Sequence, residues 1–235
     1  MLTLNSQRGV SLIEILIAIA IGMFLLLGLS SFLVNNIQTQ GSNLKTNTLN
    51  QDIRQIASLI SKDIRRAGYS GSTATNSFNN IRNCTSDSDT LPCTNSDPST
   101  TTNHCILYTY DRNKSGGTPE SNEFGGFRLN NGTIQMRTGG DTLNSCIPDT
   151  NNTWVDTTDR NIEITDLRFC YISNATNSNT NASQLPPATC NALPSTGRVN
   201  HIAVYIEGRL RSDNSVSTRN IEVIRLYNSP VRAAS

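Results

Sequence analysis

RGVSLIEILIAIAIGMFLLLGLSSFLV, residues 8–34, is a long apolar run close to the start of the chain. From Val10 to Val34 it is almost entirely apolar, and roughly 25 residues at 1.5 Å each form about 37 Å of helix, enough to cross a bilayer with some tilt. A cleaved secretory signal normally has only about 7 to 15 apolar residues before a small-x-small site, and no Ala-x-Ala site follows here. We therefore predict a membrane-spanning helix over residues 10–34.

The charges before the span predict its orientation. Arg8 and the amine of Met1 are the only positive groups there, which places the N-terminus in the cytoplasm and the rest of the chain outside the membrane.

The helical pattern continues beyond the span. Apolar residues recur at steps of three and four between residues 49 and 64, with charged residues on the opposite face. Gly41 is the only strong breaker between Val34 and this stripe, and Gly68 supplies a stop. We therefore predict one helix of about 58 residues, roughly 87 Å long, whose amphipathic half covers residues 35–68. The apolar stripe consists of Leu49, Ile53, Ile56, Leu59, Ile60 and Ile64.

Six cysteines lie beyond the apolar segment, a distribution typical of an oxidising compartment. No Cys-x-x-Cys spacing occurs and the chain has two histidines, so disulfides are favoured over a metal site. Six cysteines allow 15 pairings, among which the sequence alone does not choose. Our prediction is sequential pairing: Cys84 with Cys93, Cys105 with Cys146, and Cys170 with Cys190.

Glu14 is an acid close to the start of the apolar run. An ionisable residue at the centre of a membrane helix costs roughly 2.5 to 3.5 kcal/mol and is a functional candidate by default. The alternative is that Glu14, only a few residues from Arg8, reaches the lipid headgroups at small cost.

The order Arg8, Gly9, Val10, three further residues and Glu14, followed by a long apolar helix, resembles the class III signal of type IV prepilins. The resemblance implies that a prepilin peptidase of the inner membrane cuts after Gly9 and methylates the new amine of Val10. It also implies that the Glu14 carboxylate neutralises the N-terminal ammonium of a neighbouring subunit in the filament core. The chain departs from the family at Val10, where Phe is commoner, and it lacks the proline that many major pilins carry in the apolar helix.

The C-terminal region, residues 69–235, is predicted to be a β-sheet domain with long loops. Residues 70–103 read as a polar loop, and β-patterned segments follow at 104–110, 126–129, 133–138, 162–172, 199–211 and 217–228. An antiparallel sheet packed on the amphipathic half of the helix would bury both apolar faces, which is an α+β fold. The same order of elements is the pilin architecture, after the leader at residues 1–9.

Three segments, KDIRRAGYSG (62–71), ITDLRFCY (164–171) and RLYN (225–228), resemble the PilW group of minor pilins. That likeness implies a subunit of the inner membrane with its C-terminal domain in the periplasm, later incorporated into the surface pilus. Its implied partners are other minor pilins and the major pilin, in a complex that primes pilus assembly and caps the tip, often with a large adhesin.

Other functions find little support. Asp111, Asn113 and Ser115 resemble the start of a calcium loop, but Asn122 stands where the closing acid belongs, so an ordinary hairpin loop is favoured. No nucleophile with a base, no phosphate-binding loop and no cofactor motif is evident, and we predict no enzyme and no cofactor. The net charge of +1 gives no case for nucleic acid. Two alternatives stay open: a J-type pseudopilin of type II secretion, and a periplasmic binding domain tethered by the helix.

Overall fold

The computed structural model describes residues 11–71, 76–84, 104–143, 145–147, 150–172 and 197–232. The chain divides into two compact units, Met1–Lys45 and Thr46–Ser235, and the boundary lies within one continuous helix. We call the second of these the C-terminal unit. In chain order the elements are α1 (Leu12–Ile64), η1 (Asn76–Phe78), β1 (Asn80–Cys84), β2 (Cys105–Thr109), η2 (Ser121–Glu123), β3 (Phe124–Asn130), β4 (Thr133–Gly139), β5 (Thr153–Asp156), β6 (Ile162–Tyr171), β7 (His201–Leu210), β8 (Asp213–Arg225) and β9 (Val231–Arg232).

The single long helix is confirmed. α1 has 53 residues and runs without interruption through Gly22, Gly28 and Gly41, where an added Cβ would meet nothing within 4 Å. In the C-terminal unit the predicted stripe is buried, except for Leu59, which is 39% exposed. The helix ends at Ile64, and the turn after it closes at Gly68, whose φ of +79° is a conformation that favours glycine.

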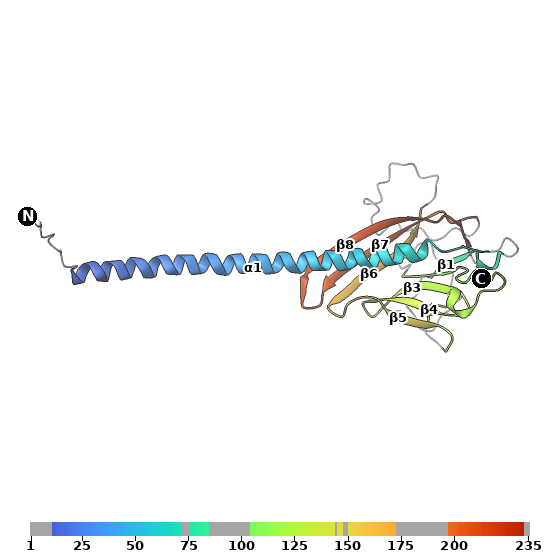
Figure 1. Cartoon of the computed structure of the whole chain (residues 1–235), viewed down its shortest axis with the longest axis horizontal. Helices are drawn as coiled ribbons and strands as arrows, with labels where there is room; N and C mark the ends of the chain where they lie inside the picture. Colours follow the sequence, from blue (N-terminus) through green and yellow to red (C-terminus); the bar gives the residue numbers. More distant parts are fainter. Residues whose placement is uncertain are drawn as a thin grey trace, which may run out of the picture. The chain divides into compact units, whose positions relative to one another are not determined.

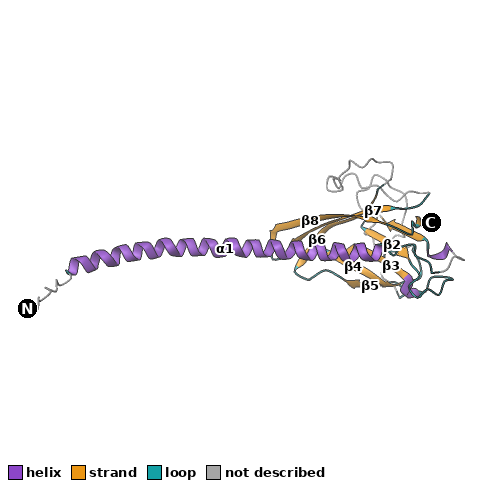
Figure 2. Ribbon diagram, turned by 45° about the horizontal axis from the view of Figure 1, so that its top comes forward, coloured by secondary structure: helices purple, strands orange, loops and turns teal. Residues whose placement is uncertain are grey.

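The predicted strands form two sheets rather than one. The larger sheet has the strand order β5-β4-β3-β2-β1-β9, and the smaller one has the order β6-β7-β8. All pairings are antiparallel except that of β1 with β9, which is parallel. Within the C-terminal unit, Figures 1 and 2 show β8 and β5 on opposite sides of the second half of α1.

One hydrophobic core joins the helix to both sheets. Leu49, Ile53 and Ile60 of α1 belong to the same buried cluster as residues of the large sheet and of the small sheet. The helix approaches β7 closely at Gly208, where an added Cβ would lie 2.9 Å from Ile53 Cδ1. Side chains from both sheets therefore pack against the one apolar stripe of the helix. This is the burial that the sequence pattern predicted.

The polar segment after Gly68 was only partly predicted. Residues 80–84 form β1 at the interior of the large sheet, with Ile81 fully buried, so the prediction of loop there was wrong. The error has a physical cause: Ile81 is the only aliphatic residue in this strand, and its pairing with β2 comes from the tertiary fold. β5 and β9 were also missed.

Candidate functional site: the helix start and the pole of the C-terminal unit

The first turn of α1 is built on Ser11. The backbone N–H groups of Glu14 and Ile15 donate to the Ser11 carbonyl at 3.0 and 3.3 Å, and Glu14 is the acid of this first turn. A carboxylate near a helix N-terminus is favourable because the unpaired N–H groups there carry partial positive charge. Ser11 and Glu14 also have the S-x-x-E spacing of a capping box, a signal that the sequence analysis missed.

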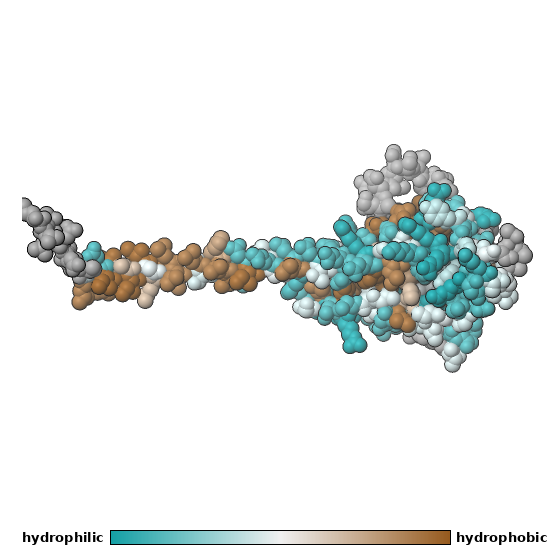
Figure 3. Space-filling model, viewed as in Figure 1, coloured by the Kyte–Doolittle hydropathy of each residue, from teal (hydrophilic) through white to brown (hydrophobic). Residues whose placement is uncertain are grey.

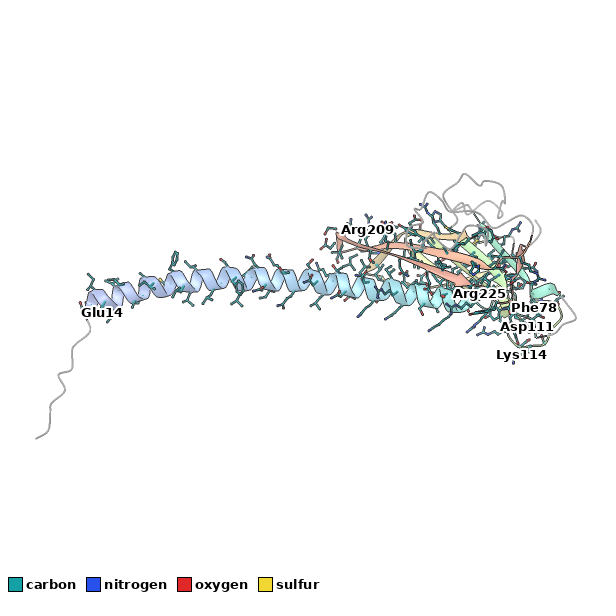
Figure 4. The ribbon with its side chains drawn as sticks, turned by 90° about the horizontal axis from the view of Figure 1, so that it is seen from above. Glu14, Phe78, Asp111, Lys114, Arg209 and Arg225 are labelled. Atoms are coloured by element: carbon teal, nitrogen blue, oxygen red, sulfur yellow. A yellow bond between two sulfur atoms is a disulfide. The ribbon has the colours of Figure 1, made fainter. Side chains whose placement is uncertain are left out.

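Glu14 therefore has a local role besides the one implied by the family. Its side chain is exposed, lies at the start of the helix (Figure 4), and forms no ion pair with any described residue. Gly9 and Val10, the predicted cleavage and methylation residues, lie outside the described residues. Processing between them remains a prediction.

Figure 3 shows that the first half of α1 is mostly apolar on the face in view. Its large side chains are mostly more than half exposed, for example Leu12 at 77% and Phe24 at 79%. The most apolar 18-residue stretch of the helix has a mean hydropathy of 2.7, so α1 is long and apolar enough to cross a membrane. The hydroxyl of Ser30 donates to the Leu26 carbonyl at 2.8 Å, so this polar group is satisfied within the helix.

The end of α1 is tied to β2 by a chain of polar contacts. The Tyr108 hydroxyl donates to the Asp63 carboxylate, which also pairs with Arg66 at 3.4 Å. The Arg66 guanidinium lies over the Tyr110 ring at 5.7 Å from its centroid. Burial, and secondly the neighbouring Asp63 charge, raise the pKa of Tyr108 well above its ordinary value. The hydroxyl therefore stays protonated and keeps donating at neutral pH.

The calcium-loop candidate forms hydrogen bonds within its own loop. Asn113 Oδ1 accepts from Ser115 N at 2.8 Å, and Asp111 Oδ2 accepts from Gly71 N and Gly116 N. Glu123 is buried, and its carboxylate accepts from the backbone of Arg112. Across the described ranges no three His, Cys, Asp or Glu side chains are grouped to hold a metal. The ordinary loop favoured from the sequence over calcium binding stays a prediction, and these contacts are consistent with it.

One of the three predicted disulfides is confirmed, and the other two involve residues outside the described ones. Cys105 and Cys146 form a disulfide, as predicted, and it pins the chain after β4 against a small cluster that includes Leu107 and Leu143. Cys170 is also disulfide-bonded, but its predicted partner Cys190 lies outside the described residues. Cys93, the predicted partner of Cys84, lies outside them as well.

Comparison with known families decides the identity of this chain. A family model described as prepilin peptidase-dependent protein B matches residues 42–226, and one described as prokaryotic N-terminal methylation motif matches residues 4–30. The first match covers more than half of the chain. The chain belongs to the prepilin peptidase-dependent protein B family. No significant match to it occurs among the curated proteins or among the solved structures.

As a member of the prepilin peptidase-dependent protein B family, the chain is a type IV pilin-like protein, which confirms the resemblance drawn from residues 8–34. The methylation motif spans Gly9, Val10 and Glu14, so processing by a prepilin peptidase is implied. The family is pilin-like and is not a known family of enzymes. The finer likeness to PilW-type minor pilins stays a prediction.

Proposed function

We propose that this protein is a minor subunit of a type IV pilus that helps to prime assembly in a complex at the pilus tip. The observation that carries the proposal is Glu14, an acid in the first turn of an exposed apolar helix that begins within a prepilin methylation motif. In a helix that only tethered a domain to lipid, this carboxylate would serve the first turn of the helix alone.

The physical role of Glu14 follows from the cost of charge in an apolar medium. Cleavage after Gly9 creates an ammonium on Val10, and both this ammonium and the Glu14 carboxylate are costly when each is alone among apolar helices. Paired between neighbouring subunits, they become tolerable. The apolar side chains of residues 12–34 would then be covered first by lipid and later by the helices of other subunits.

Location and partners follow from the same proposal. The subunit spans the inner membrane once with its C-terminal domain in the periplasm, as the positive charge of Arg8 favours, and then enters the pilus. Its partners are the prepilin peptidase, other minor pilins, the major pilin and an adhesin at the tip.

The test is a Glu14→Leu substitution in a host whose piliation depends on this protein. We expect the variant to be inserted and cleaved but to reduce surface pili strongly, because the ammonium of a neighbour would lose its partner. Ile13→Leu is the matched control, since it alters the adjacent apolar position and leaves the charge intact. Normal piliation with Glu14→Leu would support the tether instead, and loss of protein secretion with normal pili would indicate a pseudopilin.

A further inference from the structure

A groove of about 450 Å³ lies at the end of the C-terminal unit where α1 terminates. Three segments that are far apart in sequence line it: the turn after α1, the end of β2 and the turn after β8. Asp111 and Arg225 mark this end in Figure 4, and Arg209 lies at the other end of the β7–β8 hairpin. The chain enters the unit near that other end, where Thr218 donates to Asn50 of α1. We call the groove the polar-end groove.

The polar-end groove is rich in positive charge. Arg65, Arg66 and Arg112 line it against a single acid, Asp111. Arg66 is engaged by Asp63 and by the Tyr110 ring, but neither Arg65 nor Arg112 forms an ion pair with any described residue, and both are exposed. An anionic partner would meet two guanidinium groups that form no ion pair with the described residues.

Asp111, the acid in the lining of the groove, has one unpaired carboxylate oxygen. The residue is 1% exposed, and its Oδ2 atom accepts from Gly71 N and Gly116 N. Its Oδ1 atom is buried and has no hydrogen-bond partner among the described residues. Buried acceptors are rarely left unpaired, because the lost hydration costs free energy, so this oxygen points to a missing donor.

Apart from Asn228, the remaining lining is aromatic. Tyr69, Tyr110 and Tyr227 contribute rings, and Tyr227 is 72% exposed with the Arg225 guanidinium 5.5 Å from its ring centroid. Tyrosine and arginine are among the residues most enriched where proteins bind one another. An exposed tyrosine stacked with arginine is a preformed surface for a peptide segment.

We propose that the polar-end groove docks an acidic segment of a partner protein. Carboxylates of the segment pair with Arg65 and Arg112, and its aliphatic parts pack on Tyr69 and Tyr227. The inference rests on the proposed function, since it assigns the contact surface that this subunit presents to another component of the assembly.

The experiment measures peptide binding to the full-length protein in a neutral detergent with EDTA present. The probe is labelled, N-acetylated hexaglutamate, and hexaglutamine is its uncharged control. We expect hexaglutamine to bind at least about tenfold more weakly, because charged hydrogen bonds to arginine are lost. The double variant Arg65→Glu/Arg112→Glu should weaken hexaglutamate binding by a similar factor, and Tyr227→Ala, at an exposed position, should also weaken it.

The matched control is Arg54→Glu/Arg160→Glu, which makes the same change of net charge at two exposed arginines outside the groove. It should change the affinity less than about twofold at physiological salt, where distant charges are screened. Equal binding of the two peptides, or equal losses in the two double variants, would overturn the proposal, as would stronger competition by glucuronate than by unlabelled hexaglutamate. None of these results depends on cleavage or on Glu14, so they are separable from a failure of the proposed function.

Discussion

For single residues, the sequence predicted the importance of Glu14 but not the contact of Tyr108. Glu14 was identified from its place after Gly9 and Val10, and the structure adds that it completes the first turn of the helix. Tyr108 was predicted only as part of a β-patterned segment. In the structure it is fully buried and donates to Asp63, 45 positions away. A local carboxylate role can be read from spacing, whereas a contact between distant segments depends on the fold.

Two buried tyrosines predict a loss of stability at alkaline pH. Burial, followed by the hydrogen bond to Glu207, raises the pKa of Tyr205 to about 12 from 10.0, and the pKa of Tyr108 is raised as well. Between pH 10 and 12 the unfolded chain therefore loses protons that the folded chain retains, so the free energy of unfolding falls as pH rises.

Denaturant titrations across this pH window would measure the effect. The Tyr205→Phe variant should lose less stability between pH 10 and 12 than the unaltered protein. Tyr227→Phe, at a side chain that is 72% exposed, serves as the control. An unchanged slope in Tyr205→Phe would contradict the assignment.

At the scale of elements, periodicity predicted what is long and repetitive. The stripe from Leu49 to Ile64 is buried as expected except at Leu59, and β7 and β8 overlap the β-patterned segments predicted at 199–211 and 217–228. The missed elements are β1, β5 and β9, of five, four and two residues. Such short strands carry too few apolar positions to show alternation, and their pairing partners hold them in place.

Neighbouring positions on α1 test the helix packing. Ile60 is fully buried and Leu59 is 39% exposed. Ile60→Ala should lower the free energy of unfolding of the C-terminal unit by about 2–5 kcal/mol, because it leaves a cavity between the helix and the sheets. Leu59→Ala should cost less than about 1 kcal/mol. Equal costs in denaturant unfolding would show that the helix face has been misplaced.

The Cys105–Cys146 disulfide gives a second test at this scale. It closes a loop with a sequence separation of 41, and removing such a bridge costs about 2–4 kcal/mol, largely by freeing the unfolded chain. Replacing both cysteines with serine should lower the unfolding midpoint accordingly, and a reductant should then have less effect than on the unaltered protein. Unchanged stability in the double variant would be the contrary result.

At the scale of the whole molecule, the sequence predicted one helix and an antiparallel sheet but not two sheets around one core. Alternation marks a strand and its buried face, but it does not say which strands lie side by side. The polar-end groove was likewise invisible, because Arg65, Asp111 and Tyr227 come together only when three distant segments meet. The processing signal was visible because its residues are contiguous.

The most direct test of the central claim is the mass of the mature N-terminus, measured on protein purified from a host with active prepilin peptidase. We expect a chain that begins at N-methylated Val10, and a variant blocked at Gly9 should keep the leader. Unaltered protein that retains residues 1–9 in that host would contradict the account.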